Sequence, residues 1–269
     1  AKSEIFKSLA KNGHAIVNAS DDKLAGIDEV NGMAPIRYAF ADSIAIPGIK
    51  VDYLASDIDD MGLAGSDVTI TGPDDFSIRV HVPLPGRHMV LNAMAAAAAG
   101  TLFGLNADQI KAGIESVNAT GGRSNVIKAN DITVIDDCYN ANPTSVKAAL
   151  DLLSRSAGRK TAILGDMFEL GTDENRLHAE VGEYAISRSI DTLICVGTLS
   201  ENMMNGAKEA LKKTPRAGAP GVKDISIHYF KTVDDLISAP IKDLISAGDT
   251  VLIKASHSMK FERIVKELT

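Results

Sequence analysis

The chain has 269 residues, of which 45% are hydrophobic and 23% charged, and its formal net charge is −7. These values are typical of a globular protein with one large or two ordinary domains. The acidic balance argues against a nucleic-acid surface and indicates a cytoplasmic protein. No apolar run of about 18 residues exists, so we expect no membrane span. The two cysteines, Cys138 and Cys195, fit no metal or disulfide spacing and are expected to pack as small apolar residues.

The first 130 residues predict short strands followed by helices. Residues 76–82 alternate apolar and polar side chains, which is typical of a half-buried antiparallel strand. An alanine-rich helix follows over 93–103, and a second helix starts at 106. The other predictions here are a short helix over 2–9 and strands over 14–18, 38–40, 44–46, 51–54 and 68–70.

His88 and Asn92 lie at the start of the alanine-rich helix, four residues apart. If the helix begins near His88, both side chains point the same way. Two polar side chains in the first turns of an otherwise apolar helix could bind a ligand. A helix cap with a satisfied asparagine explains the pair equally well.

From residue 131 onward, short apolar strands alternate with helices. This alternation predicts a parallel, doubly wound sheet with its strand ends at one edge. That edge would carry Asp136, Asp137, Asp166, Gly197 and residues 254–257. The predicted strands are 132–136, 161–165, 192–196, 225–229 and 250–254, and the predicted helices are 143–154, 174–189, 199–212, 232–246 and 259–268.

The stretch Val134–Ser145 is a strand, a polar loop and a helix start. Asn142 is a good N-cap, and Pro143 suits the first helical turn. Asp136, Asp137 and Tyr139 would lie where open α/β sheets bind ligands. A well-capped surface turn explains the local pattern about as well.

Other loops give weaker indications. Asp166, Glu169 and His178 could together bind a metal ion, but their spacing matches no structural zinc pattern. A serine nucleophile is not indicated, because no Gly-x-Ser-x-Gly turn is present. Arg123, in the glycine loop 119–125, could reach a phosphate or be a solvated arginine.

Taken together, these stretches resemble the Mur ligase family over almost the whole chain. Residues 136–143 and 164–171 are most similar to members that join D-alanyl-D-alanine to UDP-N-acetylmuramoyl tripeptide. The motifs carrying the resemblance are residues 1–6, 85–93, 122–123, 136–143, 164–171, 178–182 and 251–254.

The resemblance implies an ATP-dependent amide ligase of peptidoglycan synthesis that uses ATP and Mg²⁺ and is monomeric. Residues 1–128 would be the second half of the ATPase domain, and 129–269 a Rossmann-like C-terminal domain. No Gly-x-x-Gly-Lys-Thr phosphate loop occurs in the chain. We therefore expect a fragment that starts inside a domain and is inactive alone.

The resemblance also assigns roles to residues. Lys2 matches a lysine that is carbamylated in several sister enzymes, which gives a carboxylate-like magnesium ligand. Lys2 in that form and His88 would act in catalysis and hold the metal, and Lys254 would be a third catalytic residue. Substrates would meet Asp166, Ser256 and His257. The residues expected to contact the nucleotide are Asn92, Arg123, Asp137, Tyr139 and Asn142.

His257 departs from the family pattern, in which arginine stands there. This puts one phosphate or carboxylate contact in doubt, because a neutral imidazole lacks the arginine fork.

Two other functions stay open. One is a non-catalytic, ligase-derived binding module that needs a partner chain. The other is a flavodoxin-like nucleotide or flavin domain, although that fold would not need residues 1–128.

Overall fold

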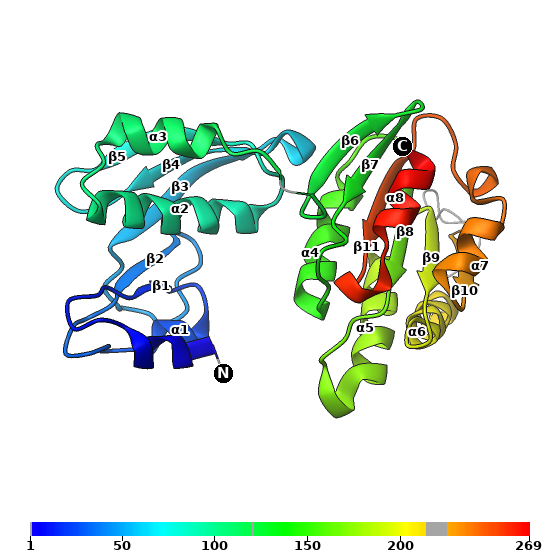
Figure 1. Cartoon of the computed structure of the whole chain (residues 1–269), viewed down its shortest axis with the longest axis horizontal. Coiled ribbons are helices and arrows are strands. Elements are labelled where there is room, and N and C mark those ends of the chain that lie inside the picture. Colours follow the sequence, from blue (N-terminus) through cyan, green and yellow to red (C-terminus); the bar gives the residue numbers. More distant parts are fainter. Residues whose placement is uncertain (1, 120, 214–224) are drawn as a thin grey trace. The chain divides into compact units, whose positions relative to one another are not determined.

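The computed structural model describes residues 2–119, 121–213 and 225–269, which form two compact α/β units. The units are Ala1–Asn118 and Ala119–Thr269 (Figure 1). The sequence analysis placed a boundary ten residues later, after residue 128. The difference arises because strand β6 (Asn125–Ala129) pairs with the second sheet, and that pairing was not predicted.

The first unit contains a five-stranded sheet with the order β1-β2-β3-β4-β5. Strands β1 to β3 pair in parallel, whereas β3-β4 and β4-β5 are antiparallel pairs. The predicted strand over 44–46 is absent. That segment is a bend whose Ile44 and Ala45 pack against the small core of Ala19, Ala25 and Ala39. The strands are β1 (Ile16–Asn18), β2 (Ile36–Phe40), β3 (Tyr53–Asp60), β4 (Ser66–Thr71) and β5 (Ser77–Val82).

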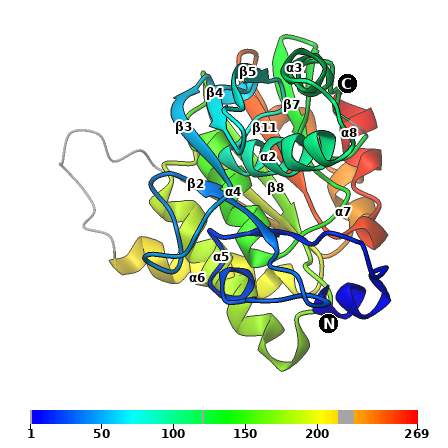
Figure 2. The same ribbon diagram turned by 90° about the vertical axis from the view of Figure 1, so that its left-hand side faces the viewer.

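Two helices cover the sheet of the first unit. Helix α2 (Arg87–Leu102) buries its small residues against β1 to β4, and its path over the strands can be followed in Figure 2. Helix α3 (Ala107–Glu115) begins with the capping box of Asn106 and packs on β5. Alanines allow this close packing because they add little volume between helix and sheet. The short helices are η1 (Lys2–Ser8), α1 (Asp22–Ala25) and η2 (Gly62–Ala64).

The second unit contains a six-stranded sheet with the order β10-β9-β8-β11-β7-β6. Its five core strands are parallel, as predicted, and β6 is an antiparallel edge strand. Every residue of the two strands β9 and β11 is buried, because helices cover both faces of the sheet. The five are β7 (Ile132–Asp136), β8 (Lys160–Gly165), β9 (Thr192–Val196), β10 (Ser226–Phe230) and β11 (Thr250–Lys254).

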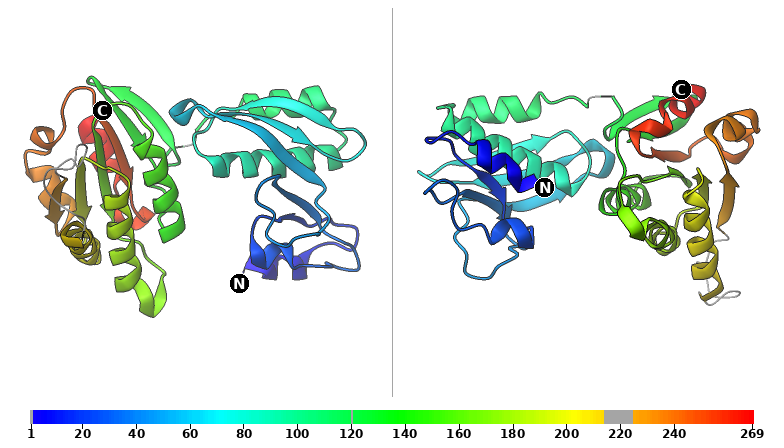
Figure 3. Two further views of the ribbon diagram at one scale, coloured as in Figure 1. Left: turned by 180° about the vertical axis from the view of Figure 1, so that it is seen from behind. Right: turned by 60° about the horizontal axis from the view of Figure 1, so that its bottom comes forward.

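Helices pack on both faces of this sheet, and Figure 3 shows them from two further sides. Helix α4 contacts β8 and β11, α6 contacts β9 and β10, and α5 packs on both helices. Helices α7 and α8 contact β10 and β7 and bury Leu236 and Ile264 in a shared core. The helices are α4 (Pro143–Ser154), α5 (Glu174–Ser187), α6 (Ser200–Lys213), α7 (Val233–Ser238) and α8 (Glu262–Leu268), with short η3 (Gly171–Asp173), η4 (Ile241–Leu244) and η5 (His257–Met259).

The helix predicted over 232–246 is interrupted. Helix α7 ends at Ser238, and η4 starts at Ile241, after Pro240. The residue before a proline is disfavoured in helical conformation, and Ala239 is extended, with ψ of 160°.

Across the described ranges, no helix combines the length and hydropathy needed to cross a bilayer.

Candidate functional site

The parallel strands of the second unit all end at one edge of the sheet. Residues following β7, β8 and β11 therefore come together there, as the sequence analysis predicted. In open α/β sheets, ligands bind at this carboxyl edge. The loops at this edge in the described residues are 137–142 after β7, 166–170 after β8, 197–199 after β9 and 255–256 after β11.

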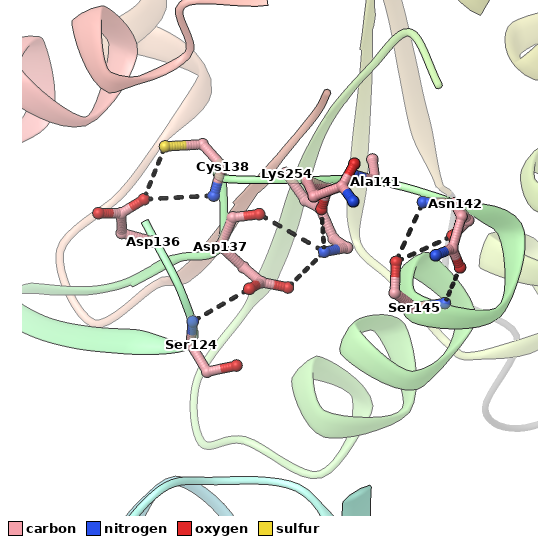
Figure 4. Close-up of polar contacts among 9 residues, drawn as sticks. Ser124, Asp136, Asp137, Cys138, Ala141, Asn142, Ser145 and Lys254 are labelled. Carbon is pink, nitrogen blue, oxygen red and sulfur yellow. Dashed lines mark hydrogen bonds and ion pairs between the residues drawn. The ribbon is translucent and has the colours of Figure 1, made fainter. Parts of the chain in front are cut away.

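Asp137 and Lys254 form a buried ion pair at the centre of this edge. The Lys254 Nζ lies 2.6 Å from Asp137 Oδ2 and also donates to the carbonyl oxygen of Asn140 at 2.8 Å (Figure 4). The other Asp137 oxygen accepts from the Ser124 backbone N–H at 3.0 Å. Lys254 thus ties the β7 loop to β11, and Asp137 ties it to the loop before β6.

Asp136 is also turned inward. Its Oδ1 accepts from the Cys138 thiol at 2.9 Å, and its Oδ2 accepts from the Gly122 N–H at 3.2 Å. Burial, followed by the hydrogen bond to Asp136, raises the pKa of the Cys138 thiol. Asp136 and Cys138 therefore hold the glycine loop against β7, with Tyr139 N donating to the Gly122 carbonyl at 2.8 Å.

Three predicted site residues meet on the exposed side of the same edge. The Arg123 guanidinium lies 4.1 Å from the centroid of the Tyr139 ring. The His257 ring lies 5.4 Å from that ring, tilted by 40°. Tyr139 is 45% exposed. We call Arg123, Tyr139 and His257 the exposed ring cluster. It offers a cation and two ring faces to an anionic or planar ligand.

Asn142 is the N-cap of α4, as predicted. Its side chain accepts from the Ser145 N–H at 2.9 Å, and Ser145 Oγ accepts from the Asn142 N–H at 3.1 Å. Its side-chain carbonyl is therefore occupied within the fold.

Asp166 is buried and caps helix α6. Its Oδ1 accepts from both the N–H and the hydroxyl of Ser200, each at 2.7 Å. The carboxylate lies against Gly197, where an added Cβ would come within 2.3 Å of Oδ1. Gly197 has φ of +123°, which L-residues with a side chain rarely adopt. The sequence analysis did not identify Ser200, although a serine at a helix start was its signal.

Ser256 and His178 fix the loop after β8. Ser256 N donates to the Asp166 carbonyl at 3.1 Å, and its hydroxyl accepts from Phe168 N at 2.9 Å. The buried His178 accepts from Met167 N through Nε2 and donates from Nδ1 to the Glu174 carbonyl. Both His178 nitrogens are engaged, so it does not join Asp166 and Glu169 at a metal. Indeed, within the described part of the chain no three His, Cys, Asp or Glu side chains gather as a metal site.

The remaining predicted residues lie in the first unit. Helix α2 starts at Arg87, so His88 and Asn92 occupy its first turns, and both are exposed. The His88 ring lies over Gly86, where an added Cβ would come within 2.8 Å of the ring, and the φ of +101° at Gly86 is unfavourable for residues with a side chain. Lys2 lies in η1, and its side chain is outside the described residues.

This geometry defines a class: an α/β protein whose second unit is a Rossmann-like domain with polar side chains at its carboxyl edge. The chain belongs to the Mur ligase family. The model of the Mur ligase middle domain matches residues 1–100, and that of the Mur ligase glutamate ligase domain matches residues 122–257.

Individual relatives agree with this assignment. The chain is 36% identical, over 82% of its length, to the UDP-N-acetylmuramoyl-tripeptide–D-alanyl-D-alanine ligase of Bacillus subtilis, of which it covers 46%. For the Escherichia coli enzyme of that name, the values are 34%, 100% and 54%. A crystal structure of MurF from Acinetobacter baumannii superposes with a TM-score of 0.81 and 27% identity, covering all of this chain and 54% of the other. The chain thus spans about half the length of its relatives.

Proposed function

We propose that the protein containing this chain is a cytoplasmic, monomeric, ATP-dependent ligase that joins D-alanyl-D-alanine to UDP-N-acetylmuramoyl tripeptide in peptidoglycan precursor synthesis. The observation that carries the proposal is the match, along the whole chain, to relatives bearing that name. The residue motifs at the carboxyl edge lie within that match.

The chemistry must make an amide from a carboxylate, which is a poor electrophile. ATP supplies the phosphoryl group that turns a carboxylate oxygen into a leaving group, and the dipeptide amine then displaces it as phosphate. The reaction concentrates negative charge, so the site needs fixed cations and aligned donors. It must also keep water from the activated carboxyl group.

The residues present fit a nucleotide. Arg123 offers an exposed guanidinium, which suits phosphate oxygens because it is always charged. The Tyr139 ring beside it offers a surface for a base or ribose. In the first unit, exposed His88 and Asn92 offer an imidazole and an amide from the same end of α2. We propose Arg123 and Tyr139 as nucleotide contacts on this geometry, and His88 and Asn92 as nucleotide contacts on the family resemblance.

We propose Mg²⁺ as the metal on the family resemblance. The described residues supply no complete ligand cluster. Mg²⁺ commonly keeps several waters and binds one or two protein groups together with substrate phosphates, so a full cluster is not required. His88 and Lys2 remain its proposed holders from this chain, Lys2 on resemblance alone and in a carbamylated, carboxylate-like form, because an ammonium group cannot bind a cation.

We propose that Asp137, Asn142, Asp166, Lys254 and Ser256 act mainly by positioning. Their polar atoms bind other parts of the same edge. Lys254 and Asp137 hold the loop that carries Tyr139, and Ser256 precedes His257. Substrate contacts are then left to side chains that remain exposed.

The test uses the complete protein. Purified enzyme is mixed with ATP, Mg²⁺, UDP-N-acetylmuramoyl tripeptide and D-alanyl-D-alanine, and the pentapeptide product is measured by mass spectrometry alongside phosphate release. We expect both products only when all components are present. Residues 1–269 alone, which lack a phosphate loop, should give neither. A complete, folded protein that forms no amide product would overturn the proposal.

A further inference from the structure

The loop after β8 contains one residue, Glu169, whose backbone conformation and side chain have no role in the site described above. Glu169 has φ of +62°, in the left-handed region, where a residue other than glycine, asparagine or aspartate is uncommon. The residue is exposed. Strain of this kind clusters at functional sites when the surroundings enforce it.

The surroundings do enforce it. The three residues before Glu169 are each fixed by a different partner. Ser200 binds the Asp166 carboxylate, His178 binds Met167 N, and Ser256 binds Phe168 N. The loop is therefore held from α6, α5 and the segment after β11, and it presents Phe168 and Glu169 outward. Phe168 is 38% exposed.

The charges at this edge select what Glu169 could bind. Three aspartates at this edge are all hydrogen-bonded or ion-paired within the fold: Asp136 to Gly122 and Cys138, Asp137 to Lys254, and Asp166 to Ser200. Glu169 differs, because within the described residues its carboxylate makes no hydrogen bond or ion pair. A carboxylate left in this state suits an ammonium group. The exposed phenyl ring of the preceding residue can also attract an ammonium group.

We propose that Glu169, with Phe168 beside it, binds the α-ammonium group of the incoming dipeptide. The proposal rests on the function proposed above. Ser256 joins the Glu169 loop to the segment carrying His257. A carboxylate and an imidazole are thus held on connected loops, which matches a zwitterion with an ammonium at one end and a carboxylate at the other. Glu169 is a specificity residue in this scheme.

The test compares Glu169→Gln and Glu169→Gly in the complete enzyme. Glutamine removes only the charge, so the KM for D-alanyl-D-alanine should rise at least tenfold while the KM values for ATP and the tripeptide nucleotide stay within twofold. Glycine should give the same rise in KM, yet leave the melting temperature equal or higher, because it relieves the left-handed backbone. Glu183→Gln, an exposed charge change on α5, is the control and should leave all three KM values unchanged.

A second probe isolates the ammonium group. D-lactoyl-D-alanine carries a hydroxyl in its place and should inhibit wild type and Glu169→Gln equally. An active wild type whose KM for the dipeptide is unchanged in Glu169→Gln would overturn this inference alone. A shift confined to the KM of the tripeptide nucleotide would also overturn it, since that substrate can carry its own amine. An inactive wild type would overturn both proposals.

Discussion

The Nζ of Lys254 lies 2.6 Å from Oδ2 of Asp137, with 3% of the lysine side chain and 18% of the aspartate side chain exposed. A charge this deeply buried is stable only with its counter-charge in place. Removing the aspartate and removing the lysine should therefore lower the free energy of unfolding by different amounts, because the charge that remains is buried to a different extent in each case. Comparing the stability of the two single substitutions therefore tests the pairing.

We expect Asp137→Asn to lower the free energy of unfolding by about 3 kcal/mol, because it leaves the buried ammonium without its counter-charge. Lys254→Met should cost less, since the remaining Asp137 carboxylate is partly exposed and still accepts from Ser124. Denaturant unfolding of the chain, followed by circular dichroism, measures both.

The double variant sharpens this prediction. Asp137→Asn combined with Lys254→Met should be about as stable as Lys254→Met alone, because the second change then removes no buried pair. Lys266→Met, on the exposed face of α8, is the control and should change stability by less than about 0.5 kcal/mol. Additive losses in the double variant would contradict the assigned pairing.

The same pair shows what the sequence could and could not predict. Strand alternation placed Asp137 and Lys254 at one edge, because parallel strands all end there. It could not tell a ligand-facing carboxylate from one paired inward. That distinction depends on side-chain contacts between residues 117 positions apart, which no local pattern encodes.

Other differences have similar causes. Strand β6 was missed because its residues 125–129 follow a glycine loop and pair only with β7. The helix predicted over 232–246 is broken at Pro240, although apolar residues continue on both sides of it. In contrast, Asn142 was correctly predicted as an N-cap, since a cap depends only on neighbours along the chain.

Gly197 should tolerate no side chain. An added Cβ would lie 2.3 Å from Asp166 Oδ1, and φ of +123° is unfavourable for alanine. Gly197→Ala should therefore destabilise the second unit by about 3 kcal/mol or more, through strain and displacement of the Asp166 cap.

Gly171→Ala is the matched control for that change. Gly171 also has positive φ, +68°, but nothing lies within 4 Å of the added Cβ. Its cost should be only the left-handed backbone penalty of about 1 kcal/mol. Thermal and denaturant unfolding compare the two, and equal losses would show that the contact with Asp166 is unimportant.

Both cysteines should be unreactive in the folded protein. Burial raises the thiol pKa of Cys138 and of Cys195, and Asp136 adds to the rise at Cys138. A raised pKa means less thiolate at a given pH, and the thiolate is the reactive form. We expect a thiol-specific dye to label neither residue over an hour at pH 8, and both in denaturant. Rapid labelling of native Cys138 would contradict the assigned hydrogen bond.

The exposed ring cluster gives the last prediction. Tyr139→Ala removes the ring that supports Arg123, and a cation–π contact of this kind is worth about 1 kcal/mol. In the complete protein it should weaken nucleotide binding about fivefold or more, measured by calorimetry, whereas Tyr139→Phe should keep its affinity within twofold of wild type because the ring remains.

Tyr184→Ala is the control. Tyr184 lies on helix α5 and makes the same kind of contact, at 4.4 Å, with Arg188, which directly follows that helix. It should lower stability without changing nucleotide affinity. Equal affinity losses in Tyr139→Ala and Tyr184→Ala would mean that the effect is structural, and Tyr139 would then lose its proposed role as a nucleotide contact.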